Sequence, residues 1–191
     1  DLHGQQDPQF TQYMFNTMRV NPGYAGSREE GSLMVTGRFQ WLGLNGAPET
    51  QSVSYERSFR NRIGLGVNLT NDTWGPSSEI YLDVNTSYTI NFSRYGKLAL
   101  GLKLGGRRFN VDWSKGSHLE QPDQNFSQNI NKFFPTVGFG VYYYQKNYYW
   151  GLSVPNFLKT SHFDVSSNAV SNERLHLFFI SGYVFDLRND F

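Results

Sequence analysis

Residues 79–92 read EIYLDVNTSYTINF, and apolar and polar side chains alternate along this stretch. Successive side chains of a β-strand point to opposite faces of its sheet, so the pattern predicts a strand with one apolar and one polar face. The stretch is also longer than the roughly 9–11 residues with which a tilted strand crosses a bilayer. The apolar face holds Ile80, Leu82, Val84, Tyr88, Ile90 and Phe92, and the polar face holds Glu79, Asp83, Asn85, Ser87, Thr89 and Asn91.

The same period of two recurs along most of the chain. It predicts about eight strands, which indicates an all-β fold built as an antiparallel up-and-down sheet or barrel. The strands are expected at 31–41, near 49–58, and at 62–70, 79–92, 97–105, 135–145, 148–155 and 174–187.

The connections between these strands alternate in length. Neighbouring antiparallel strands place successive connections at opposite ends of the sheet, so the short ones gather at one end and the long ones at the other. Outer-membrane barrels have this asymmetry, with short periplasmic turns and longer extracellular loops. The N-terminus would then be periplasmic. The long connections are 42–48, 71–78, 107–134 and 156–173, and the short ones are 59–62, 93–96 and 145–147.

Periodicity alone leaves open which face points outward. A soluble ligand-binding barrel has the same alternation with its apolar face inside. Two features favour a transmembrane barrel: a polar face rich in Gly, Asn, Ser, Lys and Arg, and aromatic residues near strand ends, where membrane interfaces carry aromatic girdles. These aromatic residues are Trp41, Tyr55, Phe59, Trp74, Tyr88, Phe92, Tyr148 and Trp150.

The hairpin at 135–154 allows a prediction for single side chains. Val137, Phe139, Val141, Tyr143, Tyr148, Trp150, Leu152 and Val154 are expected outward. Gly138, Gly140 and Gly151 are expected to face the interior and leave room there for other side chains. Tyr142, Tyr144 and Tyr149 are expected to point inward, where an N-terminal helix could pack on them.

Residues 1–30 lack the alternation and form a separate N-terminal segment, periplasmic or placed as a plug, with the barrel at 31–191. Asp7 is a suitable helix N-cap and Pro8 suits the first helical position. Asn21 and Pro22 should end this amphipathic helix. A helix of about 12 residues is marginal alone, so it must dock on the barrel or on a partner.

The composition points away from catalysis. The 191-residue chain has a net charge of +1 and no Cys, which excludes a Cys nucleophile and gives no basic surface for nucleic acid. No nucleophile, phosphate-binding or metal motif is present, and the four His are scattered. We therefore expect no catalytic, cofactor-binding or metal-binding residues, no cofactor, and a protein that is not an enzyme.

Charged residues on the expected inner face should pair with one another, because a buried charge needs a partner or water. About eight strands leave an interior only large enough for side chains, so a filled interior is preferred over a selective pore. The basic members are Arg38, Arg57, Arg62, Lys97, Lys103 and Arg107, and the acidic members are Glu56, Glu79 and Asp83.

The segments QDPQFTQYMFNTMRVNPGYAG and RFQWLGLNGAPETQSVSYE resemble the PorP/SprF family of outer-membrane proteins of the type IX secretion and gliding apparatus of Bacteroidota. The positions that match the family motif are expected to serve in capping, turns and barrel packing, with partner contact as the alternative. They are Asp7, Pro8, Gln12, Tyr13, Asn16, Asn21, Pro22, Tyr24, Gly26, Arg38, Gln40, Trp41, Gly46 and Pro48.

The resemblance implies a non-enzymatic outer-membrane barrel that anchors, or assists the export of, a large surface protein such as an adhesin or its C-terminal domain. It also implies contact with periplasmic, peptidoglycan-linked secretion components, and the location implies contact with the bilayer and lipopolysaccharide. Family members are longer than this chain, so we expect the barrel at 31–191 to be incomplete at its C-terminus and to have more than eight strands. A porin-like channel and a soluble ligand-binding barrel are the alternatives.

Overall fold

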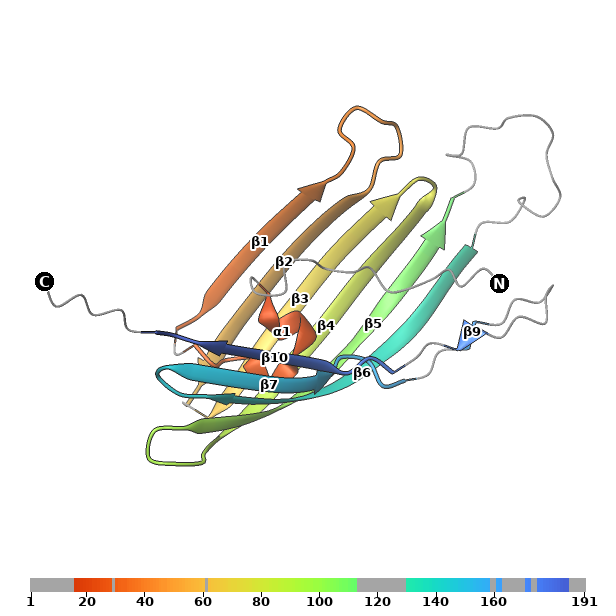
Figure 1. The fold of residues 1–191 in the computed structure, drawn as a ribbon. Coiled ribbons are helices and arrows are strands. Elements are labelled where there is room, and N and C mark those ends of the chain that lie inside the picture. The colour runs from red at the N-terminus through yellow and green to blue at the C-terminus, as the bar shows by residue number, and fades with distance from the viewer. Residues whose placement is uncertain are drawn as a thin grey trace, which may run out of the picture.

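A computed structural model describes residues 16–28, 30–60, 62–112, 130–158, 161–162, 171–172 and 175–185 of the chain. Eight strands form one sheet in the order β1-β2-β3-β4-β5-β6-β7-β10, and every neighbouring pair is antiparallel (Figure 1). The strands are β1 (Ser32–Phe39), β2 (Glu49–Phe59), β3 (Ile63–Trp74), β4 (Ser77–Asn91), β5 (Lys97–Val111), β6 (Ile130–Tyr144), β7 (Tyr148–Val154) and β10 (Phe178–Tyr183).

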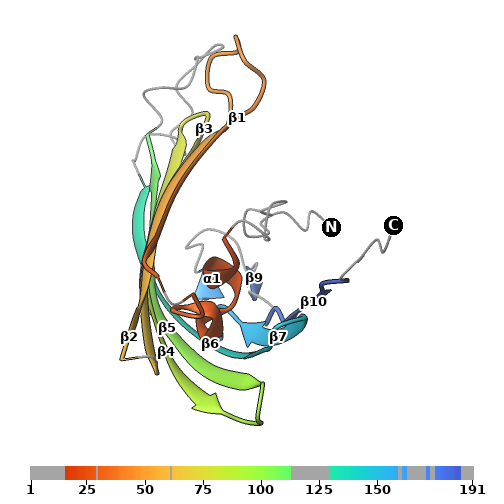
Figure 2. The same ribbon diagram turned by 90° about the vertical axis from the view of Figure 1, so that its left-hand side faces the viewer.

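The sheet is strongly curled, so that it forms a half-barrel with a concave and a convex face (Figure 2). The predicted all-β, antiparallel up-and-down fold is therefore confirmed. A separate pair, β8 (Ser161–His162) and β9 (Ser171–Asn172), lies in the connection between β7 and β10.

The convex face carries the apolar side chains, which is the reverse of a soluble protein. In β4, the outward apolar side chains Ile80, Leu82, Val84, Tyr88 and Ile90 are between 41% and 50% exposed. Asp83 and Asn85 of the same strand are 7% and 0% exposed. Side chains alternate across a strand, so the polar residues of this strand line the concave face. Apolar residues that face outward in this way suit hydrocarbon as the surrounding medium.

The outward apolar row also has the right height for a bilayer. From Ile80 to Phe92 it spans about 40 Å along the strand at roughly 3.3 Å per residue. A strand tilt of about 40° reduces this to about 30 Å, which is the thickness of the hydrocarbon core.

β3 and β4 extend toward each other beyond their predicted ends, and this changes one connection. β3 continues to Trp74 and β4 begins at Ser77, so the expected long loop at 71–78 is instead the two-residue turn Gly75-Pro76. The reason is that Asn71, Asp72 and Thr73 still pair with β4 although their side chains are polar. The expectation of a long connection there is wrong.

The other connections keep the predicted arrangement, with shifted bounds. The short turns 60–62, 92–96 and 145–147 lie at one end of the sheet, which we call the turn end. The connections 40–48 and 75–76 lie at the opposite end, which we call the loop end, and β5 ends and β6 begins at the same end. β7 is shorter and ends opposite Phe139, partway along β6.

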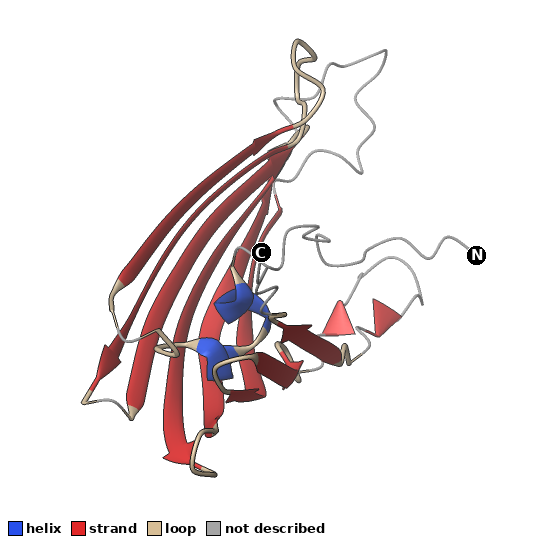
Figure 3. Cartoon of the chain, turned by 60° about the vertical axis from the view of Figure 1, so that its left-hand side comes forward, coloured by secondary structure: helices blue, strands red, loops and turns tan. Residues whose placement is uncertain are grey.

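Two short helices lie on the concave face of the sheet (Figure 3). They are the α-helix α1 (Thr17–Val20) and the 3-10 helix η1 (Pro22–Tyr24). The predicted helix does end before Asn21 and Pro22, but its expected start at Asp7 and Pro8 lies outside the described residues. None of the helices in the described part of the chain has the length and hydropathy needed to span a bilayer.

Candidate functional site

A row of very small residues crosses the concave face near the turn end. The strand register aligns Ser58 of β2, Gly64 of β3, Ser87 of β4, Gly101 of β5, Gly140 of β6 and Ser153 of β7 side by side. We call these six residues the small-residue row. Since none of them has a side chain larger than a hydroxymethyl group, the row is a shallow trough across six strands.

Residues 16–28, which we call the inner segment, lie in this trough. A Cβ on Gly64 would lie 1.9 Å from the carbonyl oxygen of Ala25, and a Cβ on Gly101 would lie 2.1 Å from the backbone nitrogen of Gly23. Both distances are far below van der Waals contact, so no side chain fits at either strand position. The trough and the inner segment are therefore matched in shape at the level of the backbone.

Asn21 joins the two short helices and is the most enclosed residue of the inner segment, with 0% exposure. Its Oδ1 accepts a hydrogen bond from the backbone N–H of Gly23 at 2.9 Å, which caps η1. Its Nδ2 donates to the carbonyl oxygen of Val141 at 3.0 Å. One side chain thus shapes the inner segment and ties it to β6.

The turn after η1 is tied to the strands on the other side of the trough. Ser87 Oγ donates to the carbonyl oxygen of Ala25 at 2.6 Å, and the backbone N–H of Gly26 donates to the Glu56 carboxylate at 3.1 Å. Gly26 has a φ of +67°, and a Cβ there would lie 2.4 Å from Gly64 Cα. Glycine is required at this position for both reasons.

Tyr24 packs edge-to-face on Tyr142, with ring centroids 5.2 Å apart. The rings of Tyr144 and Tyr149 adjoin Tyr142 at 5.4 and 5.7 Å, as predicted for three inward-pointing tyrosines. The Tyr24 hydroxyl also accepts a hydrogen bond from Arg28 Nε at 3.2 Å. This contact with Tyr24 is the main reason that the pKa of Arg28 is raised above its ordinary value.

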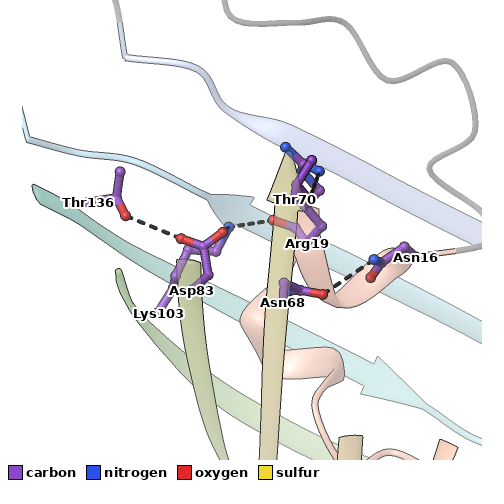
Figure 4. Close-up of polar contacts among 7 residues, drawn as sticks. All are labelled: Asn16, Arg19, Asn68, Thr70, Asp83, Lys103 and Thr136. Atoms are coloured by element: carbon purple, nitrogen blue, oxygen red, sulfur yellow. Dashed lines mark hydrogen bonds and ion pairs between the residues drawn. The ribbon is translucent and has the colours of Figure 1, made fainter. Parts of the chain in front are cut away.

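Further along the concave face, α1 is held by polar contacts with β3 (Figure 4). Asn16 donates to the side-chain oxygen of Asn68 at 3.3 Å, and the guanidinium of Arg19 donates to the Thr70 hydroxyl at 2.7 Å. The same guanidinium lies over the Tyr81 ring, 5.3 Å from its centroid. Three different groups of the sheet therefore fix the orientation of this four-residue helix.

A buried ion pair lies beneath α1. Lys103 Nζ is 3.9 Å from the Asp83 carboxylate, and both side chains are at most 10% exposed. Lys103 also donates to the carbonyl oxygen of Arg19, and the Thr136 hydroxyl donates to Asp83 at 3.2 Å (Figure 4). A buried pair with further hydrogen bonds is the arrangement that offsets the desolvation of two charges.

The predicted pairing of inner charges is correct for Lys103 and Asp83 and wrong for two arginines. Arg57 faces the convex side, where its guanidinium lies over the Phe59 ring at 5.7 Å. Arg62 belongs to the short turn between β2 and β3. Arg57 is in the same outward row of β2 as Tyr55 and Phe59, so the unbroken alternation of this strand turns it away from the concave face. Arg62 lies outside the strands, where the alternation does not apply.

The second group of motif residues lies at the other end of β1, around the connection 40–48. The backbone N–H of Gln40 donates to the carbonyl oxygen of Pro48 at 3.0 Å, and the Gly46 carbonyl oxygen accepts from Gly75 N–H at 2.9 Å. The guanidinium of Arg38 lies 3.1 Å from the Gln40 side-chain amide. Trp41, with a φ of 50°, is 68% exposed.

The motif residues therefore form two sites and not one. Asn16, Asn21, Pro22, Tyr24 and Gly26 belong to the inner segment near the turn end, and Arg38, Gln40, Trp41, Gly46 and Pro48 belong to the loop end. Asp7, Pro8, Gln12 and Tyr13 lie outside the described residues. Within the first group, Asn21 caps η1 and Gly26 forms a turn, whereas Asn16 makes no capping bond to α1.

The connection 40–48 also presents three strongly exposed apolar side chains at the loop end. Leu42 is 87% and Leu44 is 65% exposed, beside Trp41. We call Trp41, Leu42 and Leu44 the apolar loop tip. In the described part of the chain, no cluster of His, Asp or Glu is arranged to hold a metal ion.

A family model described as "Type IX secretion system membrane protein PorP/SprF" matches residues 2–191. This confirms the family predicted from the motifs in the N-terminal half. No curated protein and no solved structure matches the chain.

Proposed function

Because the chain belongs to the PorP/SprF family of type IX secretion system membrane proteins, we propose that it is a non-enzymatic outer-membrane protein that holds, or assists the export of, a large cell-surface protein. The short turns and the inner segment face the periplasm, and the loop end faces outward. An adhesin-like protein that takes part in gliding is the expected cargo, and peptidoglycan-linked secretion components are the expected periplasmic partners.

The occupied concave face is the observation that carries this proposal. Asn21 and Pro22 are fully buried against the sheet, and the inner segment fills the trough that crosses β2 to β7. The inner segment thus occupies space on the concave face that an open channel would need. This supports a role as an anchor or scaffold over the porin-like alternative, which would need a wide polar passage.

The apolar loop tip is the surface best suited to contact the cargo. Its three side chains stand on a connection braced by the turn at Gly75, so they are presented in a defined position. Tryptophans such as Trp41 are among the residues that most often dominate the binding free energy of an interface. The motif residues Gly46 and Pro48 then act by shaping the loop.

Co-purification tests the proposal. The tagged full chain is extracted in mild detergent from cells with an intact type IX machinery, beside an unrelated outer-membrane barrel that carries the same tag. Recovery of a large surface protein and secretion components with the chain alone is expected. Recovery of neither, under conditions where the machinery itself stays assembled, contradicts the proposal.

The two alternatives make different predictions. A porin-like channel would give ion conductance when the chain is inserted into planar bilayers. A soluble ligand-binding barrel would stay in the aqueous phase without detergent, and the exposed apolar convex face argues against that outcome.

A further inference from the structure

The three hairpin turns at the turn end carry positive charge only, and the exposed Glu30, just before β1, is an acidic residue at the same end. The stretches 57–63, 92–97 and 145–148 contain no Asp or Glu. They contain Arg57, Arg60, Arg62, Arg94, Lys97 and Lys146, which we call the basic collar. Register places these three stretches at one end of neighbouring hairpins, so the six cations share one rim of the sheet.

The loop end is different, because cations and anions are mixed there. Arg38, Arg108 and Lys132 lie in the same part of the sheet as Glu49, Asp72, Glu79 and Asp112. Positive charge without anions is therefore a property of these three turns, and the net charge of +1 for the whole chain does not reveal it.

The basic collar is interleaved with aromatic rings. Arg57 and Arg94 lie over the rings of Phe59 and Tyr95, at 5.7 and 5.9 Å from the ring centroids. Lys97 lies 6.0 Å from the centroid of the inward-pointing Tyr144, so it belongs to the concave side of the same rim. Arg57 leaves the apolar convex face in this way and extends along Phe59 toward the turn, as long cationic side chains do at membrane interfaces. The rings hold these cations at the depth of the rim.

An aromatic cluster on the convex side marks the same depth. Tyr143 stacks on Trp150 at 5.8 Å, and its ring lies 5.6 Å from Tyr148 and 6.2 Å from Phe92. Phe92 and Tyr95 are 69% and 77% exposed. Large exposed rings with polar edges are typical of the boundary between hydrocarbon and headgroups.

Five of the six collar cations, Arg57, Arg60, Arg62, Arg94 and Lys146, are exposed and make no ion pair within the described residues. Guanidinium groups bind phosphate through paired N–H donors, and ammonium groups bind it as point charges. A ring of such cations at headgroup depth is therefore complementary to a layer of phosphate anions.

We propose that the basic collar binds the phosphate headgroups of anionic phospholipids, and so selects phosphatidylglycerol-type lipids over zwitterionic ones around the turn end. The choice of phospholipid over lipopolysaccharide rests on the proposed orientation, in which the turn end lies in the inner leaflet. The collar then fixes the depth and tilt of the barrel at the periplasmic surface, where the inner segment is seated.

Quenching of Trp150 fluorescence by brominated lipids tests this inference on the full chain. The variant W41F/W74F/W113F leaves Trp150 as the single tryptophan, and Trp150 lies in the aromatic cluster that contacts Phe92 of the β4–β5 turn. Brominated phosphatidylglycerol and brominated phosphatidylcholine are compared in otherwise identical vesicles.

An association constant about fivefold higher for phosphatidylglycerol is expected at low salt, the factor given by one well-placed cation at a membrane surface. The preference should fall toward unity in about 1 M NaCl, where the screening length is about 3 Å. R94Q/K146Q should abolish the preference, and the charge-conserving R94K/K146R should keep it. R38Q/R108Q, which removes two cations from the loop end, should leave it unchanged.

Equal association of the two lipids, or a preference that high salt does not reduce, overturns the inference. Stronger association of brominated lipid A than of brominated phosphatidylglycerol overturns the assignment to phospholipid. Because no secretion component takes part in the measurement, its failure is distinguishable from a failure of the proposed anchoring function, which is tested by co-purification.

Discussion

Asn21 fills the space that a side chain at Gly140 would need, since a Cβ there would lie 2.0 Å from Asn21 Oδ1. The two positions are far apart in the sequence, and their contact joins the inner segment to β6. Asn21 is fully buried and bonds both to its own 3-10 helix and to the β6 backbone. The position of the inner segment thus depends on the absence of a side chain at Gly140 as much as on the hydrogen bonds of Asn21.

Replacing Gly140 should loosen this contact. G140A is expected to lower the free energy of unfolding by about 1–3 kcal/mol, the usual effect of forcing an extra carbon atom into a packed site. Urea titration of the chain in detergent micelles measures it. G37A is the matched control, because a Cβ on Gly37 meets its nearest neighbour, Phe39 Cε2, at an ordinary 3.4 Å. Equal effects of the two substitutions would contradict the steric argument.

Removal of the Asn21 side-chain amide should release η1 from the sheet. N21A loses both the cap on Gly23 and the bond to Val141, and it leaves buried groups without partners at about 1–3 kcal/mol each. Hydrogen exchange should show faster exchange at Gly23 and in the turn that follows. N16A removes one longer bond, of 3.3 Å, and should change exchange there much less.

The Lys103–Asp83 pair should behave as a buried ion pair. K103M leaves the Asp83 charge uncompensated and should destabilise the chain by about 3–5 kcal/mol, because both groups are nearly fully enclosed. The double variant K103M/D83L should recover part of this loss. Unfolding midpoints of the wild type, the two single variants and the double variant complete the cycle, and strict additivity would show that the pair is not coupled.

A cation introduced on the convex face should lower stability by an amount that depends on its depth in the bilayer. L82R places a cation in the middle of the outward apolar row, where about 2–4 kcal/mol is expected in a bilayer. S78R places it beyond that row, near the loop end, and should cost less than about 1 kcal/mol. Folding free energies measured in vesicles test the order, and its reversal would show that the convex face is not in contact with lipid.

The apolar loop tip should matter for binding and not for folding. W41A/L44A is expected to reduce recovery of the surface protein in the co-purification while leaving the unfolding midpoint within experimental error, because both side chains are exposed. Y95A removes an equally exposed ring at the turn end and serves as the control. Unchanged recovery with W41A/L44A would place the cargo contact elsewhere.

The sequence by itself determined the strands and the direction of their faces. Alternation is a local property of the sequence. The alternate apolar residues between Ile80 and Phe92 could therefore be assigned to one face of the sheet, and Tyr142 to the other, before any strand pairing was known. The family could also be recognised locally, from motifs in the N-terminal half. The ends of the strands could not be assigned in the same way. Asn71, Asp72 and Thr73 are polar and do not indicate a strand by themselves, and only their pairing with β4 makes them part of β3.

Only the tertiary structure decided how the inner segment is held. Gly64, Gly101 and Gly140 lie in three separate strands and carry no signal of their own. The register of five antiparallel strand pairs brings them into one row with Ser58, Ser87 and Ser153. The positive charge shared by the three hairpin turns arises in the same way. Both features combine residues that are distant in the sequence, and their positions are fixed by hydrogen bonding between strands.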